Sequence, residues 1–345
     1  MKLVRTEDAV GQVLCHDITQ IIPGVVKDAV FRKGHIVTEE DIPVLLSVGK
    51  ENLYIWEKQE GMLHENEAAE ILRQICQGEH MHPSEVKEGK IELIADCEGV
   101  LKINTEKLNA VNNLGEMMIA SRHGNFPVKA GDKIAGTRII PLVIEEEKMQ
   151  KACEVAGKEP IFRILPYQKK KAGIVTTGSE VYYHRIEDKF TPVVIEKLKE
   201  CGVTEVKQIQ CNDDHEMITE AIQTLIEDGS DLIVCTGGMS VDPDDRTPLA
   251  IKNACTEVVT YGAPVLPGAM FMLAYCEKEG RQIPVMGLPG CVMYAKRTIF
   301  DLVLPRIMCD EKLHEKDFRL LGQGGLCLSC PVCTFPNCGF GKGKY

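Results

Sequence analysis

The stretch "LIVCTGGMSVDPDDRTP", residues 232–248, has the features of a ligand-binding turn. Its first residues form an apolar run that predicts a buried strand, and Gly237 and Gly238 follow directly. Glycines just past a strand end let the backbone approach a ligand and present N–H donors. The segment from Pro243 to Pro248 would start a helix whose N-terminus attracts phosphate. The alternative for the glycine pair alone is a plain tight turn.

Three carboxylates follow the glycines, at Asp242, Asp244 and Asp245. Carboxylates beside an anion cradle would repel phosphate unless a cation lay between them, and Mg²⁺ is the usual cation. Asp242 or Asp244 could instead cap the next helix. Asp245 lies farther into the motif, so it is the first candidate for a catalytic, Mg²⁺-binding carboxylate, and Asp244 is the second.

The pattern around this turn alternates strands and helices from about residue 166 to residue 312. Such alternation implies right-handed crossovers and an α/β fold with a largely parallel sheet covered on both faces. The turn then lies at the carboxyl end of a strand, where open α/β sheets bind ligands. The predicted strands include 172–178, 203–211 and 231–235, and the predicted helices include 191–201 and 213–229.

"TGGMSVDPDDRTP" resembles the signature of molybdopterin-binding domains in the molybdenum cofactor biosynthesis family. Three further segments are similar to that family, "VTTGSEV" at 175–181, "YGAPVLPGAMF" at 261–271 and "VMGLPGCVMYAKRTIFDLVLPRI" at 285–307. The resemblance covers about residues 165–310. It implies a three-layer α/β/α sandwich.

The order of the segments is most similar to the MoeA-type molybdopterin molybdotransferase. That resemblance implies a transferase that inserts molybdate into adenylated molybdopterin with release of AMP, assisted by Mg²⁺. Asp245 would position the cation or polarise the phosphoanhydride. It also implies a pterin site formed by Thr177, Gly178, Ser179, Glu180, Thr236, Gly237, Gly238, Met239, Ser240, Thr247, Pro267, Gly268, Leu288, Pro289 and Gly290.

The chain departs from the transferase pattern at two places. Ala269 stands where the pattern has lysine, and Cys291 with Val292 stands where it has Asn-Pro. A lysine there would pair with an oxyanion or phosphate. Two alternatives therefore remain: a non-catalytic carrier or sensor that delivers the cofactor to a molybdenum enzyme, and a CinA-like nucleotide hydrolase, which "PDDRTP" favours.

"GGLCLSCPVCTFPNCGFGKGKY", residues 324–345, stands in place of the small C-terminal barrel of the transferase. Cys327, Cys330, Cys333 and Cys338 form C-x₂-C-x₂-C-x₄-C. This spacing is one residue longer than a bacterial ferredoxin run, and four thiolates equally satisfy zinc. The predicted metal is an iron–sulfur cluster or Zn²⁺, and the alternative is a flexible, reactive tail without metal.

Residues 1–165 form a predicted N-terminal α+β region that is only loosely similar to the transferase, over 7–18 and 31–56. Helices are predicted near 42–46 and over 64–78, and a β-rich module over 90–147. The predicted domains are therefore 1–165, 166–312 and a metal-binding tail at 313–345.

Composition limits the partners. A net charge of -11 argues against broad nucleic-acid binding, and the absence of a long apolar run argues against a signal peptide or membrane span. A cytoplasmic location is expected, with the 11 other cysteines reduced. A homo-oligomer and contacts with a molybdenum enzyme or other cofactor-assembly proteins are also expected. Scattered histidines are predicted to be solvated, namely His64, His80, His82, His184 and His215.

Overall fold

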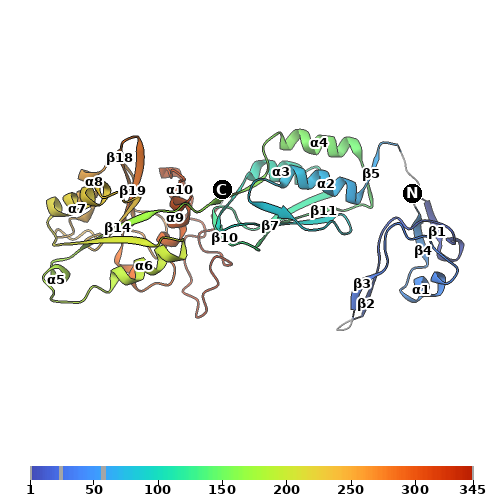
Figure 1. Ribbon diagram of the computed structural model, residues 1–345, viewed down its shortest axis with the longest axis horizontal. Helices are drawn as coiled ribbons and strands as arrows, with labels where there is room; N and C mark the ends of the chain where they lie inside the picture. The colour runs from blue at the N-terminus through green and yellow to red at the C-terminus, as the bar shows by residue number, and fades with distance from the viewer. Residues whose placement is uncertain (1, 23–25, 56–59, 344–345) are drawn as a thin grey trace. The chain divides into compact units, whose positions relative to one another are not determined.

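The computed structural model describes residues 2–22, 26–55 and 60–343 (Figure 1). It divides into two compact units, each interrupted in sequence. The first comprises Met1–Asp96, Ile103–Arg122 and Gly131–Arg163, and the second comprises Cys97–Lys102, His123–Ala130 and Ile164–Tyr345. The predicted tail is thus part of the second unit, and its standing as a separate domain stays a prediction. Two of the predicted segments end outside the described residues, namely 31–56 at Trp56 and 324–345 at Lys344 and Tyr345.

The first unit contains a four-stranded antiparallel sheet, in the order β6-β7-β11-β9, and three two-stranded sheets that pair β1 with β4, β2 with β3 and β5 with β12. Helices α1 and α2 confirm the two predicted helices, whereas α3 interrupts the predicted β-rich module. The strands are β1 (Lys2–Arg5), β2 (Ile18–Ile22), β3 (Val26–Phe31), β4 (Asn52–Ile55), β5 (Met62–His64), β6 (Met81–Pro83), β7 (Lys90–Ala95), β9 (Met117–Ser121), β11 (Lys133–Ile139) and β12 (Val143–Glu145). The helices are η1 (Thr6–Asp8), α1 (Asp41–Ser47), α2 (Glu65–Cys76), α3 (Thr105–Asn112) and α4 (Glu146–Ala156).

His64 is buried rather than solvated, so that prediction is wrong for this residue. Its ring is 1% exposed, with Nε2 2.6 Å from the carbonyl oxygen of Cys15 and Nδ1 2.9 Å from Lys33 Nζ. Burial lowers the pKa of His64, which keeps the imidazole neutral. Its role is to join β5 to the segment around Cys15 within the first unit. The other four histidines are exposed or half-buried, as predicted.

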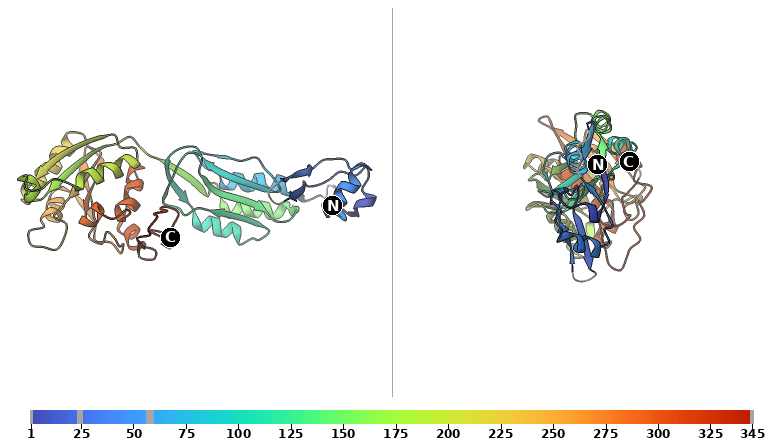
Figure 2. Two further views of the ribbon diagram at one scale, coloured as in Figure 1. Left: turned by 90° about the horizontal axis from the view of Figure 1, so that it is seen from below. Right: turned by 90° about the vertical axis from the view of Figure 1, so that its right-hand side faces the viewer.

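The second unit is built on a six-stranded sheet in the order β15-β14-β16-β19-β18-β17 (Figures 1 and 2). β15, β14, β16 and β19 are parallel, and β18 is antiparallel to both of its neighbours, β19 and β17. The strands are β14 (Lys171–Thr177), β15 (Glu205–Cys211), β16 (Leu232–Thr236), β17 (Glu257–Tyr261), β18 (Met272–Lys278) and β19 (Arg281–Leu288). The helices are α5 (Ser179–Tyr182), α6 (Phe190–Glu200), α7 (His215–Glu227), α8 (Thr247–Ala254), η2 (Gly290–Met293), α9 (Ile299–Met308) and α10 (Glu315–Arg319). A small sheet joins β10 (Phe126–Val128), β8 (Gly99–Ile103) and β13 (Phe162–Pro166).

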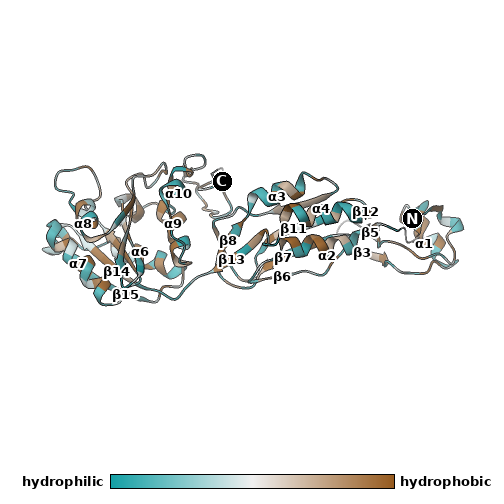
Figure 3. Cartoon of the chain, turned by 90° about the horizontal axis from the view of Figure 1, so that it is seen from above, coloured by the Kyte–Doolittle hydropathy of each residue, from teal (hydrophilic) through white to brown (hydrophobic). Residues whose placement is uncertain are grey.

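Successive side chains of the large sheet pack into two different cores. Val234 packs with α6 and α9 on one face, whereas its neighbours Ile233 and Cys235 pack with α7 and α8 on the other. Alternation along a strand sends neighbouring side chains to opposite faces, so a strand buried on both faces is largely apolar. Figure 3 colours the chain by this hydropathy. The predicted α/β fold with a largely parallel sheet, and its three-layer α/β/α arrangement, are confirmed.

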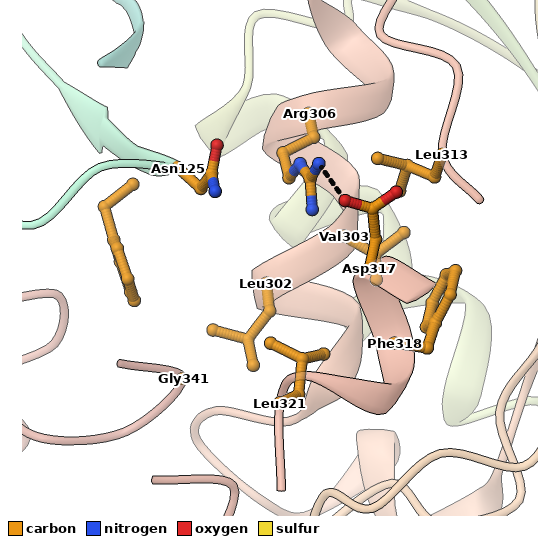
Figure 4. Close-up of a pocket in the computed structure, with 10 residues that line it drawn as sticks. Asn125, Leu302, Val303, Arg306, Leu313, Asp317, Phe318, Leu321 and Gly341 are labelled. Atoms are coloured by element: carbon orange, nitrogen blue, oxygen red, sulfur yellow. Dashed lines mark hydrogen bonds and ion pairs between the residues drawn. The ribbon is translucent and has the colours of Figure 1, made fainter. Parts of the chain in front are cut away.

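The cysteine-rich segment packs on the second unit. Phe340 is 4% exposed and joins the core that contains α9. A Cβ on Gly341 would come within 2.4 Å of Leu302 Cδ2, so the backbone here lies directly on α9 (Figure 4). Packing on α9 therefore holds the segment at Phe340 and Gly341.

No helix in the described ranges is both long and apolar enough to cross a membrane.

Candidate functional site

The four segments singled out in the sequence meet at one edge of the six-stranded sheet. Thr177, Thr236 and Leu288 end the neighbouring parallel strands β14, β16 and β19. β18 runs antiparallel to β19, with Met272 opposite Gly287, so the Pro267–Gly268 segment enters at the same edge. The structure thus brings the predicted pterin-binding segments together at the carboxyl ends of the parallel strands, as open α/β sheets do for ligands.

The Gly-Gly turn after β16 has no room for side chains. Gly237 has φ +88°, and a Cβ there would lie 2.4 Å from the carbonyl oxygen of Thr177. Gly238 has φ +54°, and a Cβ there would lie 2.8 Å from Thr247 Oγ1. Both positions need glycine because of conformation and close approach. The bare backbone of this turn therefore lies against the ends of β14 and α8.

Threonine hydroxyls hold the turn from beneath. Thr177 Oγ1 donates to the carbonyl oxygen of Thr236 at 3.1 Å and lies 3.1 Å from Thr247 Oγ1. Thr236 is 1% exposed, and its own hydroxyl has no hydrogen-bond partner among the described residues. A buried hydroxyl without a partner costs free energy unless a ligand or water satisfies it. A bound polar group would satisfy this hydroxyl, which makes Thr236 a candidate ligand contact at this edge.

Asp245 braces the loop that follows the glycines. Its Oδ2 accepts from the backbone N–H of Ser240 at 2.8 Å, and its own N–H donates to the carbonyl oxygen of Asp242 at 2.9 Å. Ser240 is exposed and Asp245 is half-buried. Since Ser240 N–H is already used by Asp245, the predicted contact of Ser240 with phosphate would have to come from its hydroxyl.

Asp244 faces an acidic pocket beside the turn. Its lining residues come from three loops and are Ser179, Asp213, Asp214, His215, Glu216, Asp244 and Arg246. Asp213 Oδ2 accepts from Ser179 N–H at 2.8 Å, which joins the β14–α5 and β15–α7 loops. Four carboxylates against one guanidinium make this pocket attractive to a cation. Asp242, by contrast, accepts from Asp244 N–H at 3.1 Å and stabilises the turn.

Other predicted site residues have mainly packing roles for their side chains. Met239 is 4% exposed and its thioether packs against Gly287. A Cβ on Gly268 would lie 2.5 Å from Ile299 Cγ2, so Pro267–Gly268 rests on the start of α9. Leu288 and Pro289 are buried, whereas Gly290 and Glu180 are exposed. Burial raises the pKa of the Cys291 thiol, so this residue is neutral where the transferase pattern has asparagine.

Tyr261 is a site residue that the sequence did not single out by itself. Its hydroxyl donates to the carbonyl oxygen of Met239 at 3.2 Å and lies 3.4 Å from the carbonyl oxygen of Ser240. Burial, and then the negative charge of Asp245, raise the pKa of Tyr261. This residue opens the segment 261–271, and only the pairing of β17 at the sheet edge reveals its contact with the loop.

A second polar cluster lies at the end of β14, on the side of the sheet that α6 covers. The sequence by itself did not predict it. Thr176 Oγ1 lies 2.8 Å from Thr191 Oγ1, and Gln208 Nε2 donates to both Thr176 and Asp188 at 2.9 Å. Burial would raise the pKa of Asp188, but hydrogen bonds from Thr191, Phe190 and Gln208 outweigh it and lower the pKa. The cluster fixes the start of α6 beside the site.

The four predicted cysteine ligands line one cavity of about 590 Å³. Cys327 and Cys338 are half-buried, and Cys330 and Cys333 are exposed. Pro267, Lys296 and Arg297 line the same cavity. Across the residues that the structure describes, no group of three or more His, Cys, Asp or Glu side chains is spaced to hold a metal ion. Within those same residues, no cysteine forms a disulfide.

Comparison with known families finds a match for part of each unit. Residues 173–308 match the family of the "probable molybdopterin binding domain", and residues 3–57 match a domain of unknown function (DUF8806). The first match spans the six-stranded sheet and all four loops of the site. The second unit therefore contains a domain of the molybdopterin-binding type.

Two curated relatives match shorter stretches. A CinA-like protein of Mycobacterium sp. (strain MCS) is 35% identical over 85 residues, which cover 25% of this chain and 20% of that protein. A CinA-like protein of Mycobacterium avium (strain 104) is 34% identical over 95 residues, which cover 28% of this chain and 22% of that protein. The match thus spans about a fifth of the length of these relatives.

Two solved structures also align with the chain. The tungsten cofactor synthesizing protein MoaB of Pyrococcus furiosus has a TM-score of 0.32 and 22% identity, covering 36% of this chain and 84% of that one. The molybdopterin biosynthesis enzyme MoaB of Thermus thermophilus has a TM-score of 0.33 and 19% identity, covering 41% of this chain and 98% of that one.

Proposed function

We propose that this protein binds molybdopterin or its adenylate at the carboxyl edge of the six-stranded sheet and inserts molybdate into it, as a transferase. The convergence of the four loops around the bare Gly237–Gly238 turn carries the proposal. The match of residues 173–308 to the molybdopterin-binding family supports it. We further propose that the protein acts in the cytoplasm as a homo-oligomer and passes the cofactor to a molybdenum enzyme or another assembly protein.

Magnesium is the cofactor that this chemistry implies, and the carboxylates of Asp244 and Asp245 fit it. Mg²⁺ prefers oxygen ligands and is often held by one or two protein carboxylates together with substrate phosphates, so a complete protein cage is not required. One Asp245 oxygen is used by Ser240 N–H, which fixes the carboxylate and leaves the other oxygen for the cation. When bound, Mg²⁺ would neutralise charge on the phosphoanhydride.

The residues of this chain then have separate roles. The backbone of Gly237 and Gly238 lets the pterin phosphate approach, and the Thr236 hydroxyl offers a buried hydrogen bond. Asp245 holds the loop and the cation together. Because Ala269 leaves no lysine in the 267–269 turn, the cation and the backbone would have to offset the phosphate charge.

Calorimetric titration with molybdopterin and with its adenylate, each with and without Mg²⁺, tests this proposal. We expect binding of both ligands, with tighter binding of the adenylate when Mg²⁺ is present. Release of AMP on addition of molybdate would then establish transfer. No detectable binding of either ligand would overturn the whole proposal.

Two other functions remain for the same site. Binding of the finished cofactor without AMP release would indicate a carrier, which Ala269 and Cys291 favour. Hydrolysis of an ADP-ribose-type substrate would indicate a nucleotide hydrolase, which the local similarity to CinA-like proteins favours. The AMP-release assay separates the first from transfer, and the hydrolysis assay identifies the second.

A further inference from the structure

The C-terminal segment lines a cavity that the pterin site does not explain. All four of its cysteines line this space of about 590 Å³. They come from an irregular part of the chain, so their common orientation does not follow from a helix or strand. Two basic side chains, Lys296 and Arg297, line the same space.

Both ends of the segment are fixed to the second unit. At the first end, Cys327 N–H donates to the carbonyl oxygen of Leu266 at 2.8 Å, and Leu266 N–H donates to the carbonyl oxygen of Gly325 at 2.8 Å. At the second end, Gly341 N–H donates to the carbonyl oxygen of Gly324 at 2.9 Å, beside the buried Phe340. These anchors position the half-buried Cys327 and Cys338 near the two ends of the loop that they enclose.

The middle of the segment is the exposed part. Leu328 and Val332 are 78% and 76% exposed, and Cys330 and Cys333 lie beside them in the chain. Lys296 Nζ donates to the carbonyl oxygen of Pro331 at 3.0 Å, which places a positive charge on the chain between these two cysteines. The described thiols are not spaced to hold a metal ion, so metal binding would require this loop to bring Cys330 and Cys333 toward the other two thiols. Such a movement would also remove apolar surface from water.

We propose that this cavity holds an iron–sulfur cluster bound by Cys327, Cys330, Cys333 and Cys338. Four thiolates can hold a tetrahedral zinc ion, with Zn–S near about 2.3 Å, or a cluster of several iron and sulfide ions, and the cavity beside these thiols has room for the larger group. The cysteine spacing is within one residue of a ferredoxin run. The four thiols lose their protons on ligation, and Lys296 offsets part of the resulting negative charge, whereas Arg297 is already paired with Glu200 and Asp301.

The cluster would lie at the edge of the proposed pterin site. Pro267 lines the cluster cavity and belongs to the loop that precedes β18 at the ligand edge. The Leu266–Pro267 segment is thus shared, with Leu266 pairing with the cysteine segment and the Pro267 carbonyl oxygen accepting from Ile299 N–H at 3.2 Å. The proposed cluster is therefore built into the domain.

Purification of the full chain without oxygen, or reconstitution with ferrous iron and sulfide, tests the assignment. We expect bound iron and acid-labile sulfide in equal amounts, a brown colour, and broad visible absorption that dithionite bleaches. Stoichiometric zinc without iron, or neither element, would overturn it. Because pterin titration uses a different readout, failure here is distinguishable from failure of the proposed function.

The double variant Cys330→Ser/Cys333→Ser tests the ligands. Both cysteines are exposed, so the variant should fold, and we expect bound iron to fall about tenfold or more with unchanged pterin binding. Cys153→Ser is the matched control, because Cys153 is an exposed cysteine of α4, and it should keep the full iron content. Retention of iron by the double variant, with visible absorption unchanged, would overturn the assignment.

Discussion

The Gly-Gly loop at 237–246 and the cysteine segment at 324–343 are both irregular, but they are held in different ways. Three adjacent strand ends and its own side chains hold the Gly-Gly loop, since Asp245 braces Ser240 and Thr177 lies under the glycines. The cysteine segment is fixed at its two ends and exposed in its middle. If the two proposed assignments hold, the first region is preorganised for its ligand and the second takes its final form only with its metal.

The two regions share one support, helix α9. Gly268 of the ligand edge packs on Ile299, and Gly341 of the cysteine segment packs on Leu302, one turn along the same helix. Asp301 lies between them and is 6% exposed. Its carboxylate accepts from Lys197 Nζ at 2.7 and 2.9 Å, from Arg297 at 2.8 Å and from Thr298 N–H at 2.7 Å.

Asp301→Ala should damage both regions and have the largest effect. It leaves the Lys197 ammonium buried without its carboxylate and removes the cap of α9, so the free energy of unfolding should fall by about 3–5 kcal/mol. Denaturant unfolding measures this change, with pterin binding and iron content as further readouts. Glu200→Ala is the control, since it removes only the exposed partner of Arg297 and should cost within about 1 kcal/mol. Equal stability of the two variants would show that α9 does not depend on the buried pair.

Asp245→Asn should affect only the first region. The asparagine oxygen can still accept from Ser240 N–H, but the charge for Mg²⁺ is lost, so AMP release should fall by about a hundredfold or more. Iron content and thermal stability should stay unchanged. Asp242→Asn removes a charge from the same loop at a residue whose side chain only accepts from Asp244 N–H, and it should keep most of the turnover. If Asp245→Asn kept wild-type turnover and Mg²⁺ dependence, Asp245 would only hold the loop through Ser240 and would not bind the cation.

Gly237→Ala should loosen the Gly-Gly loop. The added Cβ would lie 2.4 Å from the Thr177 carbonyl oxygen at φ +88°, which costs about 1–3 kcal/mol of strain. We expect pterin affinity to fall about tenfold in calorimetry, with iron content unchanged. Gly229→Ala is the control, because Gly229 follows α7 outside the site and has φ +86°, with no atom within 4 Å of a Cβ, so this variant should bind normally. Equal affinities of the two variants would contradict the bare-backbone role of Gly237.

Gly341→Ala makes the corresponding change in the cysteine segment and should have the smallest effect on function. Its Cβ would lie 2.4 Å from Leu302 Cδ2, a side-chain end that can shift, at φ +76°. We expect the second anchor to loosen and iron to be lost several-fold faster to a chelator, with pterin binding intact. Gly339→Ala, where a Cβ meets no atom within 4 Å, is the control. Identical rates of iron loss would show that this anchor does not matter.

Local patterns in the sequence were enough to predict the architecture of the second unit. The apolar runs at 172–178 and 231–235 predicted buried strands, because the strands of a parallel sheet with both faces covered have no polar face. The periodicity of 215–227 likewise predicted α7. In the first unit, α3 at 105–112 was missed because only Val111 of this helix is buried, so its apolar stripe is weak.

The sequence by itself determined the residues of the Gly-Gly loop, the spacing of the four cysteines and the α/β class, because these depend on neighbours along the chain. Tertiary structure alone decided which distant residues meet: Tyr261 on the loop backbone, Asp213 on Ser179, the burial of His64, and the cysteine segment on α9. The physical reason is that strand order and crossovers decide which distant residues become neighbours. The sequence around one residue does not specify which distant residue will pack against it.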